Sequence, residues 1–82
     1  MIRVVLVFHG VVRDLAGAAS EGLSLEDGAG LARAVAATLA CHPRLSLMPF
    51  EVTVTRDERV IASAEPLCDG DRLDWMPATS PA

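Results

Sequence analysis

The sequence predicts an α+β fold, in which a mixed four- to five-stranded sheet carries one main helix on one face. Three observations support this class. The first segment, Ile2–His9, and the last apolar segment, Leu73–Met76, have the composition of buried strands, and Glu51–Arg56 alternates polar and apolar residues. The alanine-rich segment Leu31–Cys41 repeats apolar residues at helical spacing. Helix and strands do not alternate as βαβ units do, so a parallel α/β sheet is disfavoured.

Length and composition indicate a single globular domain. A chain of 82 residues buries roughly 60–65% of its unfolded surface, which suffices for one sheet and one helix. A hydrophobic fraction of 51% with a net charge of −4 is typical of a folded chain. All seven basic residues are arginines and they form no cluster, so we expect no nucleic-acid partner. No membrane span or signal-peptide pattern is found, which predicts a cytoplasmic protein in which Cys41 and Cys68 are reduced, semi-buried thiols.

The first strand, Ile2–His9, carries apolar residues on both of its faces. Its even positions form one fully apolar face, and Val5 and Val7 make the other face partly apolar. Such two-sided strands are typical of the centre of a sheet. One helix covers only one face, so Val5 and Val7 either bind a partner protein or lie beneath loops and edge chains. The sequence leaves both alternatives open.

Between this strand and the helix, Gly10–Gly22 is rich in turn-forming residues. We expect a single helical turn or a loop at Arg13–Gly17. A short edge strand at Gly22–Leu25 is expected to form a hairpin with the first strand.

The helix is predicted over Leu31–Cys41, where five alanines favour helix formation and allow close approach to a sheet. It is expected to end at His42-Pro43, because proline disfavours helical geometry in the residue before it. Leu31, Val35 and Leu39 repeat every four residues along the side expected to face the sheet, and Ala34 and Thr38 lie beside them on that side.

The C-terminal half is predicted to supply the remaining strands. Glu51–Arg56 is half-buried, Asp57-Glu58 turns the chain, and Arg59–Ala62 is a short partner strand. Asp69-Gly70-Asp71 then forms a tight turn before the final strand, Leu73–Met76.

The predicted order is strand, strand, helix, strand, short strand, strand, with the first and last strands paired in the centre. This is the β-grasp, or ubiquitin-like, arrangement. The domain is expected to comprise residues 1–77, because Pro77 cannot donate a hydrogen bond to a sheet ladder. A flexible C-terminal tail follows, made of Ala78, Thr79, Ser80, Pro81 and Ala82.

The sequence contains no pattern typical of a catalytic centre. His9 and His42 have no carboxylate or nucleophile at a recognised spacing, so we interpret them as structural or surface residues. The glycines form no phosphate-binding motif. The two histidines and the two cysteines lack the spacing of zinc ligands. We therefore expect no enzyme activity, no cofactor and no metal.

Several short segments of the chain match one known family: Ile2–Val4, Val11–Gly17, Leu31–Ala34, Val52–Val54, Pro66–Leu73 and Met76-Pro77. They resemble the MoaD/ThiS family of small β-grasp sulfur carriers, in particular the small subunit of molybdopterin synthase. The resemblance covers essentially the whole chain and implies a protein that works through its tail. In that family the terminal Gly-Gly carboxylate is adenylated, converted to a thiocarboxylate, and inserted into a partner's active site. By motif position the partner-binding surface would include Val60, Met76 and Pro77.

The tail departs from this family. Counting from the Asp69-Gly70-Asp71 turn, Pro81-Ala82 stands at the positions expected to be Gly-Gly. Proline fixes φ and alanine adds a methyl group, and both should hinder passage through a narrow channel.

Three hypotheses follow from this departure. We favour a non-carrier accessory or regulatory subunit that acts by binding a larger protein. The alternative is a divergent sulfur carrier that still takes a thiocarboxylate on Ala82, and a weaker hypothesis is an unrelated accessory component of a larger enzyme. The expected partner is a protein like the large subunit of molybdopterin synthase, an adenylating enzyme or an oxidoreductase.

Overall fold

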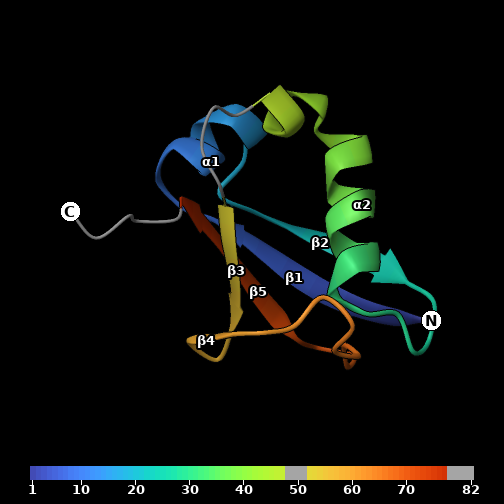
Figure 1. Ribbon diagram of the computed structural model, residues 1–82. Coiled ribbons are helices and arrows are strands. Elements are labelled where there is room, and N and C mark those ends of the chain that lie inside the picture. The colour runs from blue at the N-terminus through green and yellow to red at the C-terminus, as the bar shows by residue number, and fades with distance from the viewer. Residues whose placement is uncertain (48–51, 78–82) are drawn as a thin grey trace.

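The computed structural model describes residues 1–47 and 52–77 and contains one five-stranded mixed sheet (Figure 1). The strand order is β2-β1-β5-β3-β4, and the central strands β1 and β5 run parallel while the other pairs are antiparallel. The strands are β1 (Ile2–Phe8), β2 (Ser20–Leu25), β3 (Val52–Arg56), β4 (Arg59–Val60) and β5 (Arg72–Pro77). The helical elements are α1 (Gly10–Ala16), α2 (Leu31–Cys41) and the 3-10 helix η1 (Pro43–Leu47). The predicted α+β class and the central pairing of the first and last strands are confirmed.

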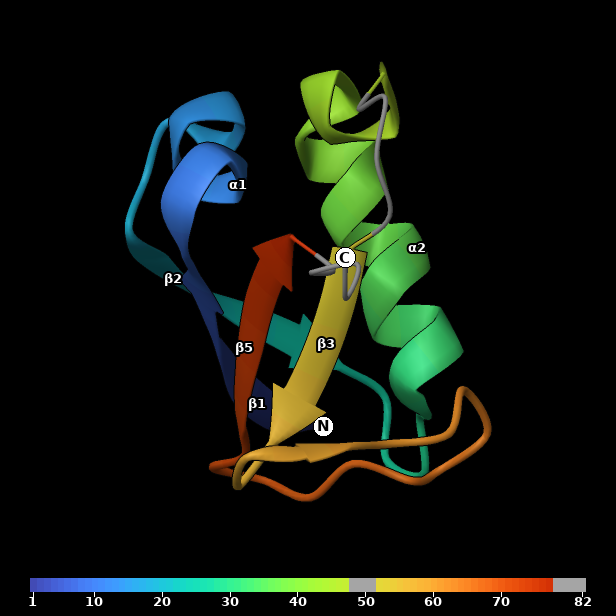
Figure 2. The same ribbon diagram turned by 60° about the vertical axis from the view of Figure 1, so that its left-hand side comes forward.

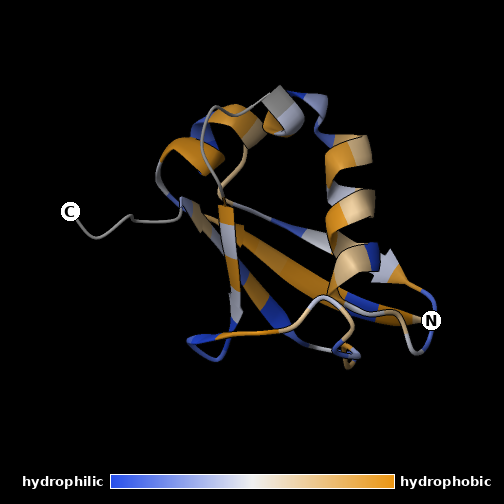
Figure 3. Ribbon diagram, in the orientation of Figure 1, coloured by the Kyte–Doolittle hydropathy of each residue, from blue (hydrophilic) through white to orange (hydrophobic). Residues whose placement is uncertain are grey.

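Helix α2 covers one face of the sheet, and α1 lies at the end of the sheet where β1 and β5 terminate (Figure 2). The core between the sheet and the helices is built from alternate residues of the strands. On β1 the buried positions are Val4, Leu6 and Phe8, and on β5 they are Leu73 and Trp75. Figure 3 shows the apolar course of β1 beneath the helices. The even-numbered face predicted for the first strand is therefore the core face.

Helix α2 has the predicted bounds, but its most buried stripe is shifted around the axis. Leu31, Ala34 and Thr38 are buried, whereas Val35 and Leu39 are only partly buried. The small side chain of Ala34 allows the helix to approach the sheet closely. Thr38 tolerates burial because its hydroxyl donates a hydrogen bond to the Ala34 carbonyl, at 2.8 Å.

Helix α1 is longer than the single turn or loop predicted at Arg13–Gly17. It begins at Gly10 and ends at Ala16. Gly17 follows as the C-cap, where its left-handed backbone (φ 76°) lets its N–H donate to the carbonyl of Arg13. Val12 is fully buried against the core. This tertiary contact stabilises a seven-residue helix that local propensity does not predict.

The predicted turn at Asp69-Gly70-Asp71 is confirmed, and it is attached to β1 by three hydrogen bonds. The Asp69 carboxylate accepts from the backbone N–H of Arg3 at 2.8 Å, and the N–H of Gly70 donates to the Arg3 carbonyl at 2.7 Å. The N–H of Val5 donates to the carbonyl of Asp71 at 2.8 Å. The turn thus fixes the start of β5 beside β1.

The two cysteines, Cys41 and Cys68, are free and exposed rather than semi-buried, which corrects the sequence prediction. No helix among residues 1–47 and 52–77 is long and apolar enough to span a membrane. The predicted tail, residues 78–82, lies outside the described residues, and so do residues 48–51.

Candidate partner-binding face

The face of the sheet opposite α2 carries four of the five residues predicted to bind a partner. Val7 pairs with Asp74, Asp74 with Thr55, and Thr55 with Val60, so these four residues form one row across the sheet. Cross-strand partners point to the same side of a sheet. Two further rows add Val5 opposite Arg72 and Met76 opposite Thr53. We call this surface, defined by Val5, Val7, Val60, Met76 and the residues between them, the open face.

Apolar side chains remain accessible on the open face. Val60 is 74% exposed and Val5 is 43% exposed, whereas Val7 and Met76 are partly buried. The sequence left open whether Val5 and Val7 bind a partner or lie beneath loops and edge chains. Since Val5 is accessible, loops do not cover it. Val5 on β1 and Val60 on β4 lie on either side of the intervening strands β5 and β3. Apolar side chains left uncovered on one face of a small folded protein make that face a candidate interaction site.

Pro77 does not share the open face. It pairs with Val52 at the end of β5 and lies beside Gly10 at the start of α1. Because residues two apart in a strand share a face, Pro77 is on the same side of β5 as the buried Trp75. The four sheet residues are brought together, and Pro77 is separated from them. The remaining predicted site residues, 78–82, lie outside the described residues.

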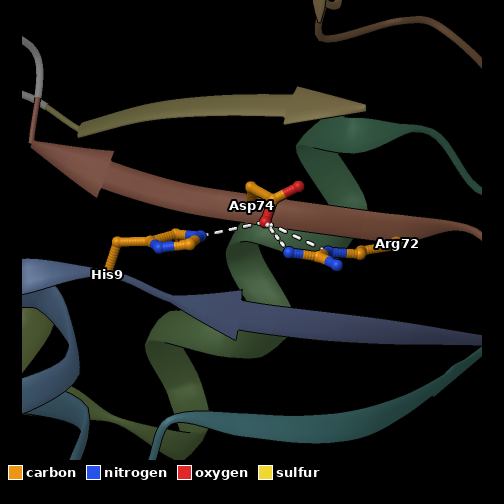
Figure 4. Close-up of polar contacts among 3 residues, drawn as sticks. All are labelled: His9, Arg72 and Asp74. Carbon is orange, nitrogen blue, oxygen red and sulfur yellow. Dashed lines mark hydrogen bonds and ion pairs between the residues drawn. The ribbon is translucent and has the colours of Figure 1, made fainter. Parts of the chain in front are cut away.

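The centre of the open face holds a polar cluster that the sequence did not reveal (Figure 4). One oxygen of Asp74, Oδ1, accepts hydrogen bonds from His9 Nε2 at 2.9 Å and from Arg72 Nε and Nη2 at 3.1 and 2.9 Å. His9 follows the end of β1, and Arg72 and Asp74 share a face of β5. The parallel pairing of β1 and β5 brings these residues together across 65 positions of sequence.

The Asp74 carboxylate is mostly buried, and its side chain is only 16% exposed. Burial is the largest single influence and favours the protonated form, but the hydrogen bonds and positive charges of His9 and Arg72 together outweigh it. The pKa of Asp74 consequently lies below its ordinary value. One signal was present in the sequence: Asp74 lies between two apolar residues of a predicted central strand, where a carboxylate needs partners.

A hollow of about 570 Å³ adjoins this cluster on the open face. It lies between the β3–β4 turn and the outer side of β5, and His9 borders it just after the end of β1. Its lining consists of His9, Thr55, Asp57, Glu58, Arg72, Asp74 and Met76.

The second histidine, His42, has a structural position at the end of α2. Its ring packs edge-on against Phe8, with centroids 5.8 Å apart, and its Nε2 pairs with the carboxylate of Glu21 on β2. This contact joins the helix to the edge strand on the core side. The interpretation of His42 as structural fits its geometry, whereas His9 belongs to the candidate site.

Acid titration provides a test of the Asp74 cluster. A carboxyl whose pKa is lowered by folding contributes stability above its unfolded pKa of about 3.9, and this is lost as the pH falls through the lower folded pKa. We expect Asp74→Asn to lower the free energy of unfolding by about 1 kcal/mol at pH 7, since a hydrogen bond to a charged group contributes little more than this when its partners are half exposed. The difference from wild type should shrink below the pH range in which Asp74 titrates.

Urea denaturation of both proteins at pH 7 and at pH 2 measures this difference. Asp14→Asn, which removes an exposed carboxylate on α1, is the control and should change stability little at either pH. An equal effect of Asp74→Asn at both pH values would contradict the claim that the charged Asp74 carboxylate stabilises the fold through His9 and Arg72.

Comparison with solved structures places this architecture among known proteins. The chain superposes on a protein described as molybdopterin converting factor subunit 1 from Pyrococcus furiosus, with a TM-score of 0.90 and 22% identity over 96% of this chain and 100% of that one. The fold is a ubiquitin-like β-grasp. Small archaeal modifier protein 1 from Haloferax volcanii matches with a TM-score of 0.87 and 20% identity, covering 96% and 100% of the two chains.

A more distant match extends the same fold. Caldiarchaeum subterraneum ubiquitin has a TM-score of 0.65 and 16% identity, with 99% of this chain and 98% of that chain covered. The sequence itself matches no protein-family model and no curated protein. The predicted β-grasp fold and the resemblance to MoaD-like proteins are thus confirmed at the level of the fold.

Proposed function

We propose that this chain is a cytoplasmic, non-catalytic β-grasp protein that acts by binding a larger protein through its open face. One observation carries the proposal: exposed Val5 and Val60 lie with partly buried Val7 and Met76 on the sheet face that α2 leaves uncovered. Burying such side chains contributes about 25 cal/mol per Å² of apolar surface removed from water. The similar proteins from Pyrococcus and Haloferax, described as a converting-factor subunit and a modifier, support a role alongside partner proteins.

The partner we propose is one that handles a MoaD-like subunit: a protein like the large subunit of molybdopterin synthase, an adenylating enzyme or an oxidoreductase. Within this class we favour an accessory or regulatory role over sulfur transfer. Pro81 and Ala82 stand where the resembled family carries Gly-Gly, and both residues restrict the backbone relative to glycine.

Binding is tested by calorimetry with purified candidates of these three kinds from the same genome. We expect the double variant Val5→Asp/Val60→Asp to bind the partner at least about tenfold more weakly, because truncating or charging a central contact costs more than about 1.4 kcal/mol. The matched control Ala32→Asp/Ala36→Asp places the same charges on exposed positions of α2 and should leave binding unchanged. Equal weakening by both variants, or by neither, would reject the open face as the binding surface.

The sulfur-carrier hypothesis has a separate test. The chain is co-expressed with an adenylating enzyme and a sulfur source, and its intact mass is measured. Replacement of one carboxylate oxygen by sulfur would establish the carrier function and overturn the accessory role. No change in the native chain, together with modification of Pro81→Gly/Ala82→Gly, would support the accessory role.

A further inference from the structure

The hollow on the open face carries more acidic than basic groups. Asp57, Glu58 and Asp74 line it, and the arginine in the lining, Arg72, is already engaged with Asp74 through both Nε and Nη2. Within residues 1–47 and 52–77, neither Asp57 nor Glu58 takes part in an ion pair. The hollow therefore retains negative charge that the protein does not compensate there.

Asp74 also keeps one oxygen available. All three hydrogen bonds from His9 and Arg72 go to Oδ1, and no described residue donates to Oδ2. Figure 4 shows this second oxygen turned away from the side chains of His9 and Arg72. A carboxylate can accept at both oxygens, so Asp74 has unused capacity beside the hollow.

The walls of the hollow suit a long side chain with a charged end. Met76 provides apolar surface in the lining, and Asp57 and Glu58 supply carboxylates from the β3–β4 turn. Arginine and lysine bury their aliphatic stems against such surface while their charged groups reach polar partners. The hollow lies on the same face as accessible Val5 and Val60, because Val5 is the strand partner of Arg72 and Val60 is the strand partner of Thr55, and both Arg72 and Thr55 line it.

Building on the proposed function, we propose that the hollow receives one arginine side chain of the partner protein. In the partner, apolar residues flank this arginine. The guanidinium group donates to Asp74 Oδ2 and to the carboxylates of Asp57 and Glu58. Arginine fits better than lysine because its planar fork serves several carboxylate oxygens at once. The net charge of −4 on this chain accelerates encounter with such a basic surface.

The test uses two short peptides, acetyl-Val-Arg-Leu-amide and the same peptide with citrulline, which has the shape of arginine without its charge. Each is titrated into the ¹⁵N-labelled full chain and followed by NMR. We expect the arginine peptide to shift the amide signals of Thr55, Asp57 and Met76 saturably, with an affinity about tenfold above that of the citrulline peptide. Equal affinities, or no saturable shift with arginine at millimolar concentration, would overturn the proposal.

A variant of the β3–β4 turn separates charge from folding. Asp57 and Glu58 have left-handed backbones, with φ of 53° and 65°, and Asn-Gly is the pair that such a two-residue turn favours. Asp57→Asn/Glu58→Gly should therefore keep or raise the Tm while reducing the preference for arginine several-fold. Asp14→Asn/Asp27→Asn makes the same change of net charge at exposed positions elsewhere and should keep the preference. An unchanged preference in the turn variant would contradict the proposed site.

The two proposals fail in different ways. If the partner's affinity depends on Val5 and Val60 but not on Asp57 and Glu58, the arginine site is wrong and the binding face stands. If the partner is insensitive to Val5 and Val60, the proposed function fails, whichever peptide binds in the hollow.

Discussion

Replacing Phe8 with alanine is expected to lower the free energy of unfolding by about 3–5 kcal/mol, the usual cost of truncating a fully buried aromatic residue. Phe8 is 2% exposed at the end of β1. Its ring packs edge-on against Trp75, with centroids 6.0 Å apart, and against His42. The variant would therefore lose transfer free energy and two aromatic contacts, and a cavity would remain. Since small domains are stable by only about 5–15 kcal/mol, it should be marginally folded.

Urea denaturation followed by the fluorescence of Trp75, the single tryptophan, measures this loss directly. Val11→Ala is the control, because Val11 is 39% exposed on the neighbouring helix α1 and its truncation should cost less than about 1 kcal/mol. A loss of similar size in both variants would show that Phe8 has no special place in the core.

The alternation within the first strand shows what local sequence can predict. Residues two apart in a strand share a face, so the pattern separated Val4, Leu6 and Phe8 from Val5 and Val7 without knowledge of the neighbours. The structure buries the first group and leaves Val5 accessible. The bounds of α2 were also predictable from neighbouring residues alone, because its helix propensity and its stop signal at His42-Pro43 are both local.

Features that depend on tertiary contacts were not predictable. Helix α1 is short, and the burial of Val12 rather than its own propensity stabilises it. The shift of the α2 stripe toward Ala34 and Thr38 depends on how closely the helix approaches the sheet. A pattern of apolar letters does not distinguish a small residue at the centre of a contact from one at its edge.

In the candidate site, too, the features set by local sequence were predictable and those set by tertiary contacts were not. The apolar members of the open face followed from strand alternation and from short motifs, although Pro77 proved to lie elsewhere. The link between His9 and Asp74 was missed because it exists only through the parallel pairing of β1 and β5. Sequence spacing says nothing about two residues that meet across a non-consecutive strand pair.

The second large effect is expected at Asp71, in the turn that leads into β5. We expect Asp71→Ala to lower the free energy of unfolding by about 2–3 kcal/mol, since hydrogen bonds to charged groups each contribute about 1.5–3 kcal/mol. Its Oδ2 accepts from the backbone N–H of Cys68 at 2.8 Å and from Arg56 Nη1 at 3.1 Å. Arg56 also donates to the Pro66 carbonyl at 3.2 Å, so the pair joins β3 to the loop that leads into β5.

Denaturation of Asp71→Ala and Asp71→Asn separates the two contributions of this carboxylate. Asparagine keeps an oxygen that can accept from the N–H of Cys68 but loses the charge that faces Arg56, so its cost should be about half that of alanine. Because the same turn sets the position of Arg72 and Asp74 on β5, the alanine variant should also shift the NMR signals of the open face. A stability close to wild type in Asp71→Ala would mean that the backbone hydrogen bonds to Arg3 and Val5 hold the turn by themselves. The aspartate would then have to be explained by something other than the fold.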